Sequence, residues 1–569
     1  MLSKLITNII ISKGKKSLKR MDENSLKAKE VNEALLFRIL KDNKNTEYGK
    51  KYNFENIKTI EDYKKMVPFS DFDTYAPYIE RMTQKNEKNL ITSYKVVHYA
   101  ESSGTIGVQK LIPVTKNSLK IYEDYTITRC SALADEHYKA IGKRITKNKG
   151  LNTLESEVRY TPSGITRGTV SGGAARSYKL IFPYYLTSPN PILFPKCEMN
   201  LVYMKARFAL ENKNMSFMFS VFMTNLLDIM TYIKNNWQLL VEDIELGQIN
   251  PKIADEKAVK DVLPFIKKNK KRADELRKIF LEGFEDCHII NKIWPELSFI
   301  SSIGSGGFAT YTDKFKKYLG DVPIDYSIYG ASEGLFAACR HINKPEFMLL
   351  PDSCFYEFLP LDNPNQTETL TLDQLEIGKE YEIIITNQCG FYRYRIKDSI
   401  IVLGYYNKTP LIAFSRRMNQ IVNICAEKTS EQHLDETIKR LSEKYKINIS
   451  DYAFYLDDSM DPSRYVVLIE PDKQIENPDY KDYSKSFDEI LCDVNREYGI
   501  YRGRGSIGEP LILFQEVGTH ACWREMKIYL GSSSNQVKPV RILDAPKKQN
   551  FFLRLVEPGQ EQINWLGKK

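Results

Sequence analysis

Two strand-like runs in this chain each lead directly into a glycine turn, and this pattern constrains the fold most. Leu297–Ile303 runs into Gly304–Gly307. Ile324–Ile328 runs into Tyr329–Gly334 in the same way. A strand, a glycine turn and a helix in succession are typical of an α/β sheet whose loops gather at one edge, where ligands usually bind. We therefore predict an α/β fold with a ligand site in these loops.

A third loop has the composition of a polyphosphate-binding loop. It reads Glu-Ser-Ser-Gly-Thr-Ile-Gly-Val-Gln-Lys over residues 101–110 and follows the strand-like run Tyr94–Tyr99. Small residues let backbone N–H groups converge on an anion, and Lys110 supplies a positive charge. The spacing does not fit the P-loop pattern G-x-x-x-x-G-K-[ST]. Since serine- and glycine-rich turns after strands are common, the loop alone leaves an ordinary turn open as well.

Length, charge and cysteine usage exclude several classes of protein. A chain of 569 residues is too long for one core, so we predict two or more domains. The net charge is +9, and its lysine clusters at 13–20 and 267–272 could meet nucleic acid or anionic lipid. We interpret them as exposed helix faces and expect no nucleic-acid partner, because no binding motif accompanies them. Nine cysteines without C-x-x-C and six unpaired histidines argue against disulfides or a His-built metal site, and favour the cytoplasm.

Two apolar runs are too short to cross a membrane. The run 215–223 is shorter than the ~20 residues that a span needs, and we interpret it as a buried helix. Near the N-terminus no export signal is visible. We predict there a helix that docks its apolar stripe on the body of the protein. That stripe consists of Leu2, Leu5, Ile6, Ile9 and Ile10.

Residues 118–135 are predicted to form one helix that carries an arginine. Tyr122, Tyr125 and Arg129 share one face of it by their spacing. The arginine could meet a substrate carboxylate or could be a structural ion-pair partner, and the residues alone favour the ion pair.

The second half of the chain changes character twice. From about residue 346 the pattern is one of strands, which predicts an antiparallel or barrel-like subdomain. The last part follows the order β-α-β-β-α-β of a split βαβ sandwich. We place the join within 415–425 and predict a large domain over 1–424 and a small one over 425–569.

Three charged residues in these segments could serve a nucleotide. Glu333 in a glycine turn could hold Mg²⁺, and Asp398 at the end of a strand could hold ribose hydroxyls. Each also has a simpler interpretation: Glu333 as a helix N-terminal acid, Asp398 as a turn former, and Lys428 as solvated surface.

In their order along the chain, these segments resemble the acyl-adenylate-forming superfamily of acyl-CoA synthetases and luciferases. They resemble more closely the Gretchen Hagen family of acyl-acid amido synthetases. The resemblance covers nearly the whole chain, and Tyr-Arg-Tyr-Arg at 392–395 makes it specific because ordinary acyl-CoA ligases lack it. The matching segments are 45–52, 67–72, 78–79, 102–113, 329–334, 356–360, 390–398, 427–431 and 531–538.

The resemblance implies a luciferase-like adenylating fold and a two-step reaction. The fold would combine a large N-terminal domain of β-sheets flanked by helices, a β-barrel-like subdomain, and a smaller mobile α+β C-terminal domain. A carboxylic acid would attack ATP to give an acyl-adenylate and pyrophosphate. An amine, usually from an amino acid, would then take the acyl group and release AMP.

The resemblance also implies a set of site residues, with ATP and Mg²⁺ as cofactors and a monomeric enzyme. Those at the nucleotide would be Ser102, Ser103, Gly104, Thr105, Tyr329, Ser332, Glu333, Tyr356, Phe358 and Asp398, with Glu333 on the metal. The catalytic lysines would be Lys110, Lys428 and Lys538. The family's corresponding helix lines the acyl pocket, which would bring Arg129, Tyr125 and Tyr122 to the substrate.

Two positions depart from the family's usual motifs, and two alternative functions stay open. Ile106 stands where a second Thr or Ser is usual, and Val537-Lys538-Pro539 departs from the usual aromatic-Lys-Thr-Pro. An acyl-CoA or carrier-protein ligase would use a thiol as the acceptor. A nucleotide-binding protein without turnover would use neither acid nor amine. The identities of the acid and the amine stay open.

Overall fold

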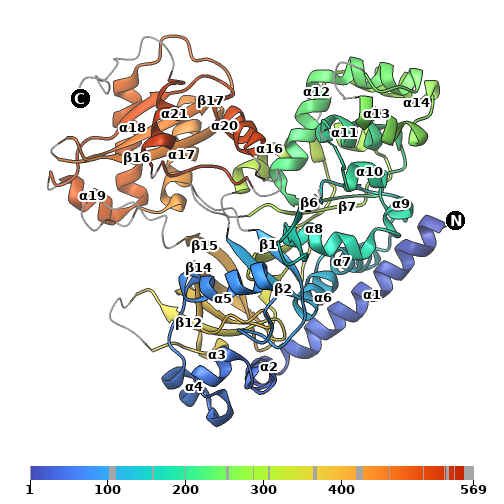
Figure 1. The fold of residues 1–569 in the computed structure, drawn as a ribbon. Helices are drawn as coiled ribbons and strands as arrows, with labels where there is room; N and C mark the ends of the chain where they lie inside the picture. Colours follow the sequence, from blue (N-terminus) through green and yellow to red (C-terminus); the bar gives the residue numbers. More distant parts are fainter. Residues whose placement is uncertain are drawn as a thin grey trace. The chain divides into compact units, whose positions relative to one another are not determined.

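A computed structural model of the chain (Figure 1) divides it into two compact units, Met1–Phe414 and Ser415–Lys569. We call them the N-terminal unit and the C-terminal unit. The residues that the structure describes are 2–101, 110–154, 156, 159–197, 199–250, 256–285, 288–305, 308–362, 368–417, 424, 427, 429–460, 462–503, 505–530, 532, 537–543 and 545–556. The predicted join at 424/425 has neighbours outside this set and stays a prediction.

The N-terminal unit begins with helices. They are α1 (Leu2–Ser25), α2 (Ala28–Asn43), α3 (Glu47–Lys51), α4 (Ile60–Met66) and α5 (Phe72–Lys85). Side chains set two of their starts: Thr59 and Asp71 each accept the N3 backbone N–H in a capping box. No helix among the described residues is both long and apolar enough to cross a membrane.

Helix α1 forms as predicted, and the predicted docking stripe is right for Ile6 and Ile10 but wrong for the other three residues. Ile10 and Leu18 are buried, whereas Leu2, Leu5 and Ile9 lie in solvent. The cause is Gly14, where an added Cβ would lie 1.9 Å from the Thr128 carbonyl oxygen. Because the helix approaches its neighbour at this glycine, its rotation is fixed with Gly14 facing inward.

The strand that leads into the glycine turn at 304–307 belongs to a parallel sheet. It has the order β3-β6-β7-β8, formed by β3 (Leu151–Asn152), β6 (Phe217–Phe222), β7 (Phe299–Ile303) and β8 (Ile324–Asp325). The expectation of a helix at 215–223 is wrong, because this run is the central strand β6, followed by α12 (Met223–Leu246). A strand covered on both faces is apolar throughout, so periodicity cannot separate it from a buried helix. Strand β7 leads through its turn into α16 (Ala309–Leu319), as predicted.

The predicted helix over 118–135 is interrupted. Helix α6 (Lys116–Tyr125) ends at Thr126, whose ψ of −109° is not helical, and α7 (Ile127–Ala140) begins anew. The break turns Tyr122 and Arg129 toward different neighbours, so they do not share one face.

Two further sheets complete the N-terminal unit. One has the order β2-β1-β5-β4, with β1 (Val96–Glu101), β2 (Leu111–Thr115), β4 (Arg159–Tyr160) and β5 (Thr166–Gly168). The other has the order β12-β13-β14-β15-β11-β10-β9. Its strands are β9 (Ile328–Ala331), β10 (Gly334–Ala338), β11 (Phe347–Leu349), β12 (Phe355–Pro360), β13 (Glu380–Thr386), β14 (Tyr394–Tyr406) and β15 (Thr409–Arg417).

The antiparallel pairing of this large sheet agrees with the strands expected after residue 346. The other helices of the unit are α8 (Val170–Ala175), α9 (Phe182–Tyr185), α10 (Asn190–Leu193), α11 (Leu201–Glu211), α13 (Glu256–Val262), α14 (Lys270–Leu281) and α15 (Ile289–Ile293).

The C-terminal unit is an α+β sandwich. Its sheet has the order β16-β17-β18, with β16 (Ile449–Asp457), β17 (Arg464–Pro471) and β18 (Leu511–Phe514). Its helices are α17 (Glu431–Tyr445), α18 (Tyr480–Val494), α19 (Arg496–Gly503), α20 (Thr519–Tyr529) and α21 (Pro546–Leu553). Helices α17 and α18 contribute Leu434, Phe487 and Leu491 to its core.

Candidate active site

A tight turn between two strands is the centre of the candidate site. Gly334 of β10 pairs with Ala331 of β9, so Ser332 and Glu333 form a two-residue hairpin turn. The predicted turn from strand to helix at 329–334 is therefore wrong. An added Cβ at Gly330 would lie 2.8 Å from the Gly334 carbonyl oxygen, so this position requires glycine. Both turn side chains are half-exposed, which makes a hydroxyl and a carboxylate accessible to a ligand.

Three side chains from outside the hairpin fix the turn. The Tyr394 hydroxyl donates to Oε1 of Glu333 at 3.2 Å, and the Asn387 amide donates to the Glu333 carbonyl oxygen at 2.7 Å. From helix α6, the Tyr122 hydroxyl donates to the Ala331 carbonyl oxygen at 2.7 Å. Burial and the Glu333 charge raise the pKa of Tyr394, so it stays a protonated donor. The turn is thus held before any ligand arrives.

A bulge in the sheet presents Asp398 behind this turn. Glu382 pairs with Ser399 and Ile384 with Arg395, so three residues of β14 oppose one residue of β13. Lys397 within the bulge has a left-handed φ of 59°. The carboxyl of Asp398 is buried and accepts the Tyr329 hydroxyl at 3.2 Å. Bulges commonly re-aim a side chain at a functional site, and this one brings Asp398 to Tyr329.

The Tyr-Arg-Tyr-Arg segment is mainly a structural clamp. Arg393 is buried; its Nε and Nη2 donate to Glu357, and its Nη1 donates to the carbonyl oxygens of Lys64 and Val67. Arg395 makes two bonds to Glu382 across the sheet. Both guanidinium groups are therefore engaged with the protein, and it is Tyr394 that reaches the turn.

The N-terminal segments that resembled a family signature converge on the same clamp. The Tyr392 ring stacks on Tyr48 at 5.0 Å, and the Tyr392 backbone N–H donates to the Tyr75 hydroxyl at 2.8 Å. The Ser70 backbone pairs with that of Tyr394 in an isolated parallel bridge. These contacts explain why motifs more than 300 residues apart occur together.

The expected phosphate loop is described at its two ends. Ser102, Ser103, Gly104, Thr105 and Ile106 lie outside the described residues. Glu101 at the end of β1 pairs with Leu111 at the start of β2, so the intervening segment joins two antiparallel strands. Lys110 is exposed, with Nζ 4.9 Å from the ring centre of Phe72 in α5. A phosphate role for this segment stays a prediction.

Arg159 and Arg167, which contact Glu101, were not predicted as site residues. Buried Glu101 contacts Nη2 of Arg159 at 2.6 Å and Nε of Arg167 at 3.4 Å. The arginines face each other across β4 and β5, and both are partly exposed. Guanidinium groups bind phosphate and carboxylate groups through paired N–H donors, so two partly exposed arginines side by side suit an anionic group of a ligand. Their proximity depends on strand pairing between distant residues, so no local pattern could have revealed it.

The contacts of Arg129 support the ion-pair alternative. Its side chain is fully buried, and Nη1 and Nη2 bond both carboxylate oxygens of Asp325 at 3.1 and 2.7 Å. Its other three N–H groups donate to backbone carbonyl oxygens, those of Tyr125, Ser327 and Cys339. All five donors are used, so none remains for a substrate carboxylate.

Three aromatic residues predicted at the site are fully buried. The Tyr356 and Phe358 side chains have no exposed surface, and the Tyr356 hydroxyl donates to the carbonyl oxygens of Phe336 and Leu350. Both side chains support the sheet, and a contact with the nucleotide stays a prediction. Tyr125 is buried as well and accepts Nε of Arg20 at 2.7 Å. Of the three residues predicted at the acyl substrate, Tyr122 is the one that bonds a residue next to the Ser332–Glu333 turn.

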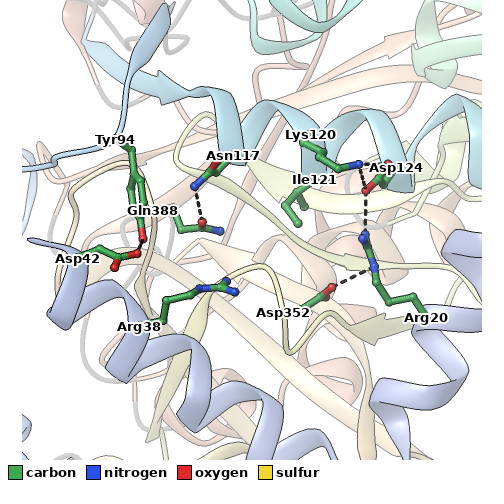
Figure 2. A pocket seen from close by; sticks show the side chains of 10 residues that line it. All are labelled: Arg20, Arg38, Asp42, Tyr94, Asn117, Lys120, Ile121, Asp124, Asp352 and Gln388. Carbon is green, nitrogen blue, oxygen red and sulfur yellow. Dashed lines mark hydrogen bonds and ion pairs between the residues drawn. The ribbon is translucent and has the colours of Figure 1, made fainter.

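A separate cavity of about 400 Å³ lies on the other side of α6 (Figure 2). Its charged groups are largely paired with one another. Lys120 contacts Asp124, which contacts Arg20, which contacts Asp352. The remaining lining residues are Arg38, Asp42, Tyr94, Asn117, Ile121 and Gln388. This ion-pair chain connects α1 with α6, so we interpret it as structural and distinct from the candidate site.

The C-terminal unit carries one of the two late lysines among its described residues. Lys538 is exposed and begins a segment that pairs with β16, where the Phe454 N–H donates to the Arg541 carbonyl oxygen. Arg541 is buried, forms an ion pair with Asp451, and stacks over the Tyr452 ring at 4.4 Å. Lys428 lies outside the described residues. The segment that carries Lys538 is therefore fixed to the sheet of its own unit.

Glu333 is a residue that could hold a metal ion. Among the described residues, no group of three or more His, Cys, Asp or Glu side chains could hold a metal ion. Mg²⁺ keeps several waters and is bound through one or two carboxylates together with substrate phosphates. A half-exposed carboxylate in a fixed turn suits that kind of coordination.

Family models and named relatives place the chain among the acyl acid amido synthetases, which are adenylate-forming ligases. The chain belongs to the GH3 (Gretchen Hagen) family. The model of the family's N-terminal domain matches residues 17–324, that of its central domain 347–417, and that of its C-terminal domain 431–547.

Named relatives and a solved structure agree with this assignment. Indole-3-acetic acid-amido synthetase GH3.4 of Arabidopsis thaliana is 29% identical over 92% of this chain and 91% of its own length. The 4-substituted benzoates-glutamate ligase GH3.12 of the same organism is 25% identical over 94% and 95%. The solved structure of the GH3.15 acyl acid amido synthetase shares the fold with a TM-score of 0.82, at 23% identity over 94% and 95% of the chains.

Proposed function

We propose that this protein is an ATP-dependent acyl acid amido synthetase that joins a carboxylic acid to the amine of an amino acid. The observation that carries the proposal is the Ser332–Glu333 turn, which is braced by Tyr394 and Asn387 and backed by Asp398. Membership of the GH3 family over most of the chain supports it.

The reaction proceeds in two balanced steps. A carboxylate oxygen attacks the α-phosphorus of ATP, and the bond to pyrophosphate breaks. The amine then attacks the carbonyl carbon of the acyl-adenylate and loses a proton, while AMP departs with the bonding electron pair. A protein nucleophile is not needed, so the protein contributes positioning and stabilisation of charge.

Residues of the turn and the bulge would hold the nucleotide. Asp398 accepts hydrogen bonds from the ribose hydroxyls, and the Tyr329 hydroxyl holds its carboxylate in place. Ser332 donates to the α-phosphate. Glu333 is the residue that would hold Mg²⁺, which would supply positive charge to the phosphate oxygens.

Residues around the segment 102–109 would serve the leaving group and the acceptor. Ser102, Ser103, Gly104 and Thr105 bind phosphate, with Lys110 near the pyrophosphate. Arg159 and Arg167 add positive charge beside them, suited to a phosphate or to the carboxylate of an amino-acid acceptor.

The two late lysines would serve the two half-reactions in turn. Lys538 acts during adenylation, and Lys428 acts near AMP afterwards. The C-terminal unit would change its orientation through residues 415–430 between these steps. The protein would act as a monomer in the cytoplasm.

The acid would be an aromatic or otherwise apolar carboxylic acid. Two relatives act on indole-3-acetic acid and on 4-substituted benzoates, as their names state.

ATP–pyrophosphate exchange with a panel of benzoates, indole acids and fatty acids tests the proposal. Exchange should depend on the acid and should fall at least a hundredfold in Asp398→Ala and in Glu333→Ala. Glu376→Ala serves as the matched control, because Glu376 is an exposed carboxylate at the surface of the same unit. Absence of exchange with every acid would support a nucleotide-binding protein without turnover and contradict the proposal.

A further inference from the structure

The outer face of helix α1 is apolar at its beginning and basic further along. Leu2, Leu5 and Ile9 are 46%, 55% and 49% exposed. Lys13 and Lys16 continue the same face, since positions 2, 9 and 16 coincide after every second turn of a helix. The opposite face packs on the N-terminal unit through a different set of residues. Helix α1 thus completes its packing and still keeps a second apolar surface in solvent.

A neighbouring segment extends this surface. Helix α9 packs beside the N-terminal half of α1 (Figure 1). Leu180, just before α9, is 87% exposed, and Tyr184 within it is 45% exposed. Tyr178 and Ile181 from the same segment pack inward with Ile6 of α1 in one apolar cluster. Single exposed apolar side chains are common on proteins, but five large ones on two adjacent elements form a surface patch.

The charge of both segments points to an anionic partner. Residues 2–20 contain six basic side chains and no acidic one, and the segment 179–184 contributes Lys179. Lys15 and Lys19 form ion pairs with Asp135 and Glu23. Lys4, Lys13 and Lys16 are exposed and pair with no acidic side chain among the described residues. Their positive charge therefore remains available to a partner.

We propose that α1 and the segment 179–184 dock on an anionic lipid surface. An amphipathic helix with large aliphatic side chains on one face and lysines around them lies in the plane of a membrane interface. The lysines alone would suit nucleic acid, but nucleic acid offers little to Leu2, Leu5 and Ile9. A lipid surface accepts both features. Helix α1 is not apolar enough to span a membrane, which agrees with attachment at the surface. This inference does not depend on the proposed enzymatic function.

Co-sedimentation of the full-length protein with lipid vesicles tests the inference. One set of vesicles is pure phosphatidylcholine, and the other contains one quarter phosphatidylglycerol. Binding to the anionic vesicles should exceed binding to neutral ones and should fall between 0.05 and 0.5 M salt. Equal or absent binding to both would overturn the proposal.

Variants locate the surface. Joint replacement of Leu2, Leu5 and Ile9 by serine should weaken partitioning at least about tenfold. Joint replacement of Lys4, Lys13 and Lys16 by glutamine should weaken it roughly a hundredfold at low salt, since each lysine contributes about fivefold. These side chains are exposed, so the unfolding temperature should not change. Unchanged partitioning in either variant would overturn the proposal.

A matched control uses the second basic cluster. Lys267, Lys268 and Lys271 are exposed and lie near exposed Leu263 and Phe265, so this region has a similar composition. Replacement of the three lysines by glutamine should leave partitioning unchanged. Loss of binding in this control, with retention in the α1 variants, would place the lipid contact elsewhere and contradict the inference. As an independent readout, tryptophan emission in Leu5→Trp should shift to shorter wavelength with anionic vesicles only.

Discussion

The buried pair of Arg129 and Asp325 separates a structural role of Arg129 from a role in substrate binding. Arg129→Met removes five hydrogen bonds and leaves the Asp325 carboxylate buried, with the Ser301 hydroxyl at 2.7 Å as a remaining donor. Removal of one partner from a buried ion pair costs about 3–5 kcal/mol. We therefore expect the variant to fold but to be clearly destabilised.

The size of the thermal shift follows from the size of the unit. Unfolding entropy is about 2.1 cal/mol/K per residue, which gives roughly 0.9 kcal/mol/K for residues 1–414. A loss of about 4 kcal/mol should lower the melting temperature by about 4–5 °C in calorimetry. The double variant with Asp325→Leu should recover most of this loss, because an apolar pair leaves no unpaired charge.

A surface variant and an enzymatic readout complete this test. Lys120→Met is the control: it breaks an exposed contact between Lys120 and Asp124, both on α6. The free energy of unfolding should fall by at most about 1 kcal/mol. In pyrophosphate exchange, Arg129→Met should change the KM for the acid less than threefold at a temperature where it is folded. A normal melting temperature together with a tenfold higher KM for the acid would refute the structural role.

Two further predictions concern the braced turn and the pH dependence of stability. Tyr394→Phe removes the donor to Glu333, and since a hydrogen bond to a charged group contributes about 1.5–3 kcal/mol, exchange should fall roughly 10- to 100-fold while the unfolding temperature falls by at most about 2–3 °C; normal exchange would show that the brace is dispensable. Burial lowers the pKa of His98 to about 4, so its contribution to stability is full above pH 6.5 and is lost as the pH falls toward 4. Between pH 7.5 and 4.5 the urea stability of the wild type should therefore drop roughly 2–3 kcal/mol more than that of His98→Asn; parallel pH profiles would contradict a neutral buried His98.

Local patterns predicted the regular elements well. Helix α17 and strands β12 and β13 have clear periodicity and turn residues at their ends. The run 215–223 was misread because a strand covered on both faces has no alternation to distinguish it from a buried helix. The turn at Ser332–Glu333 was misread because glycine marks a reversal of the chain without stating which element follows.

The candidate site could be predicted in part from the sequence, and the parts that could not be predicted share one cause. The structure connects Tyr329 to Asp398, and it connects Glu333 and Tyr122 to the same hairpin. Whether they contact a nucleotide stays a prediction. The burial and the hydrogen-bond partners of Arg129 and Tyr356 could not be predicted, because they depend on contacts between distant segments. Arg159 and Arg167 were missed for the same reason, since strand pairing brings them to Glu101.

Product analysis with two kinds of acceptor tests the central claim most directly. The enzyme is incubated with ATP, magnesium and an acid that supports exchange, and then with either the twenty amino acids or coenzyme A. We predict AMP release that requires an amino acid, together with a mass equal to acid plus amino acid minus water. AMP release with coenzyme A alone, and a thioester as the product, would contradict the assignment as an amido synthetase.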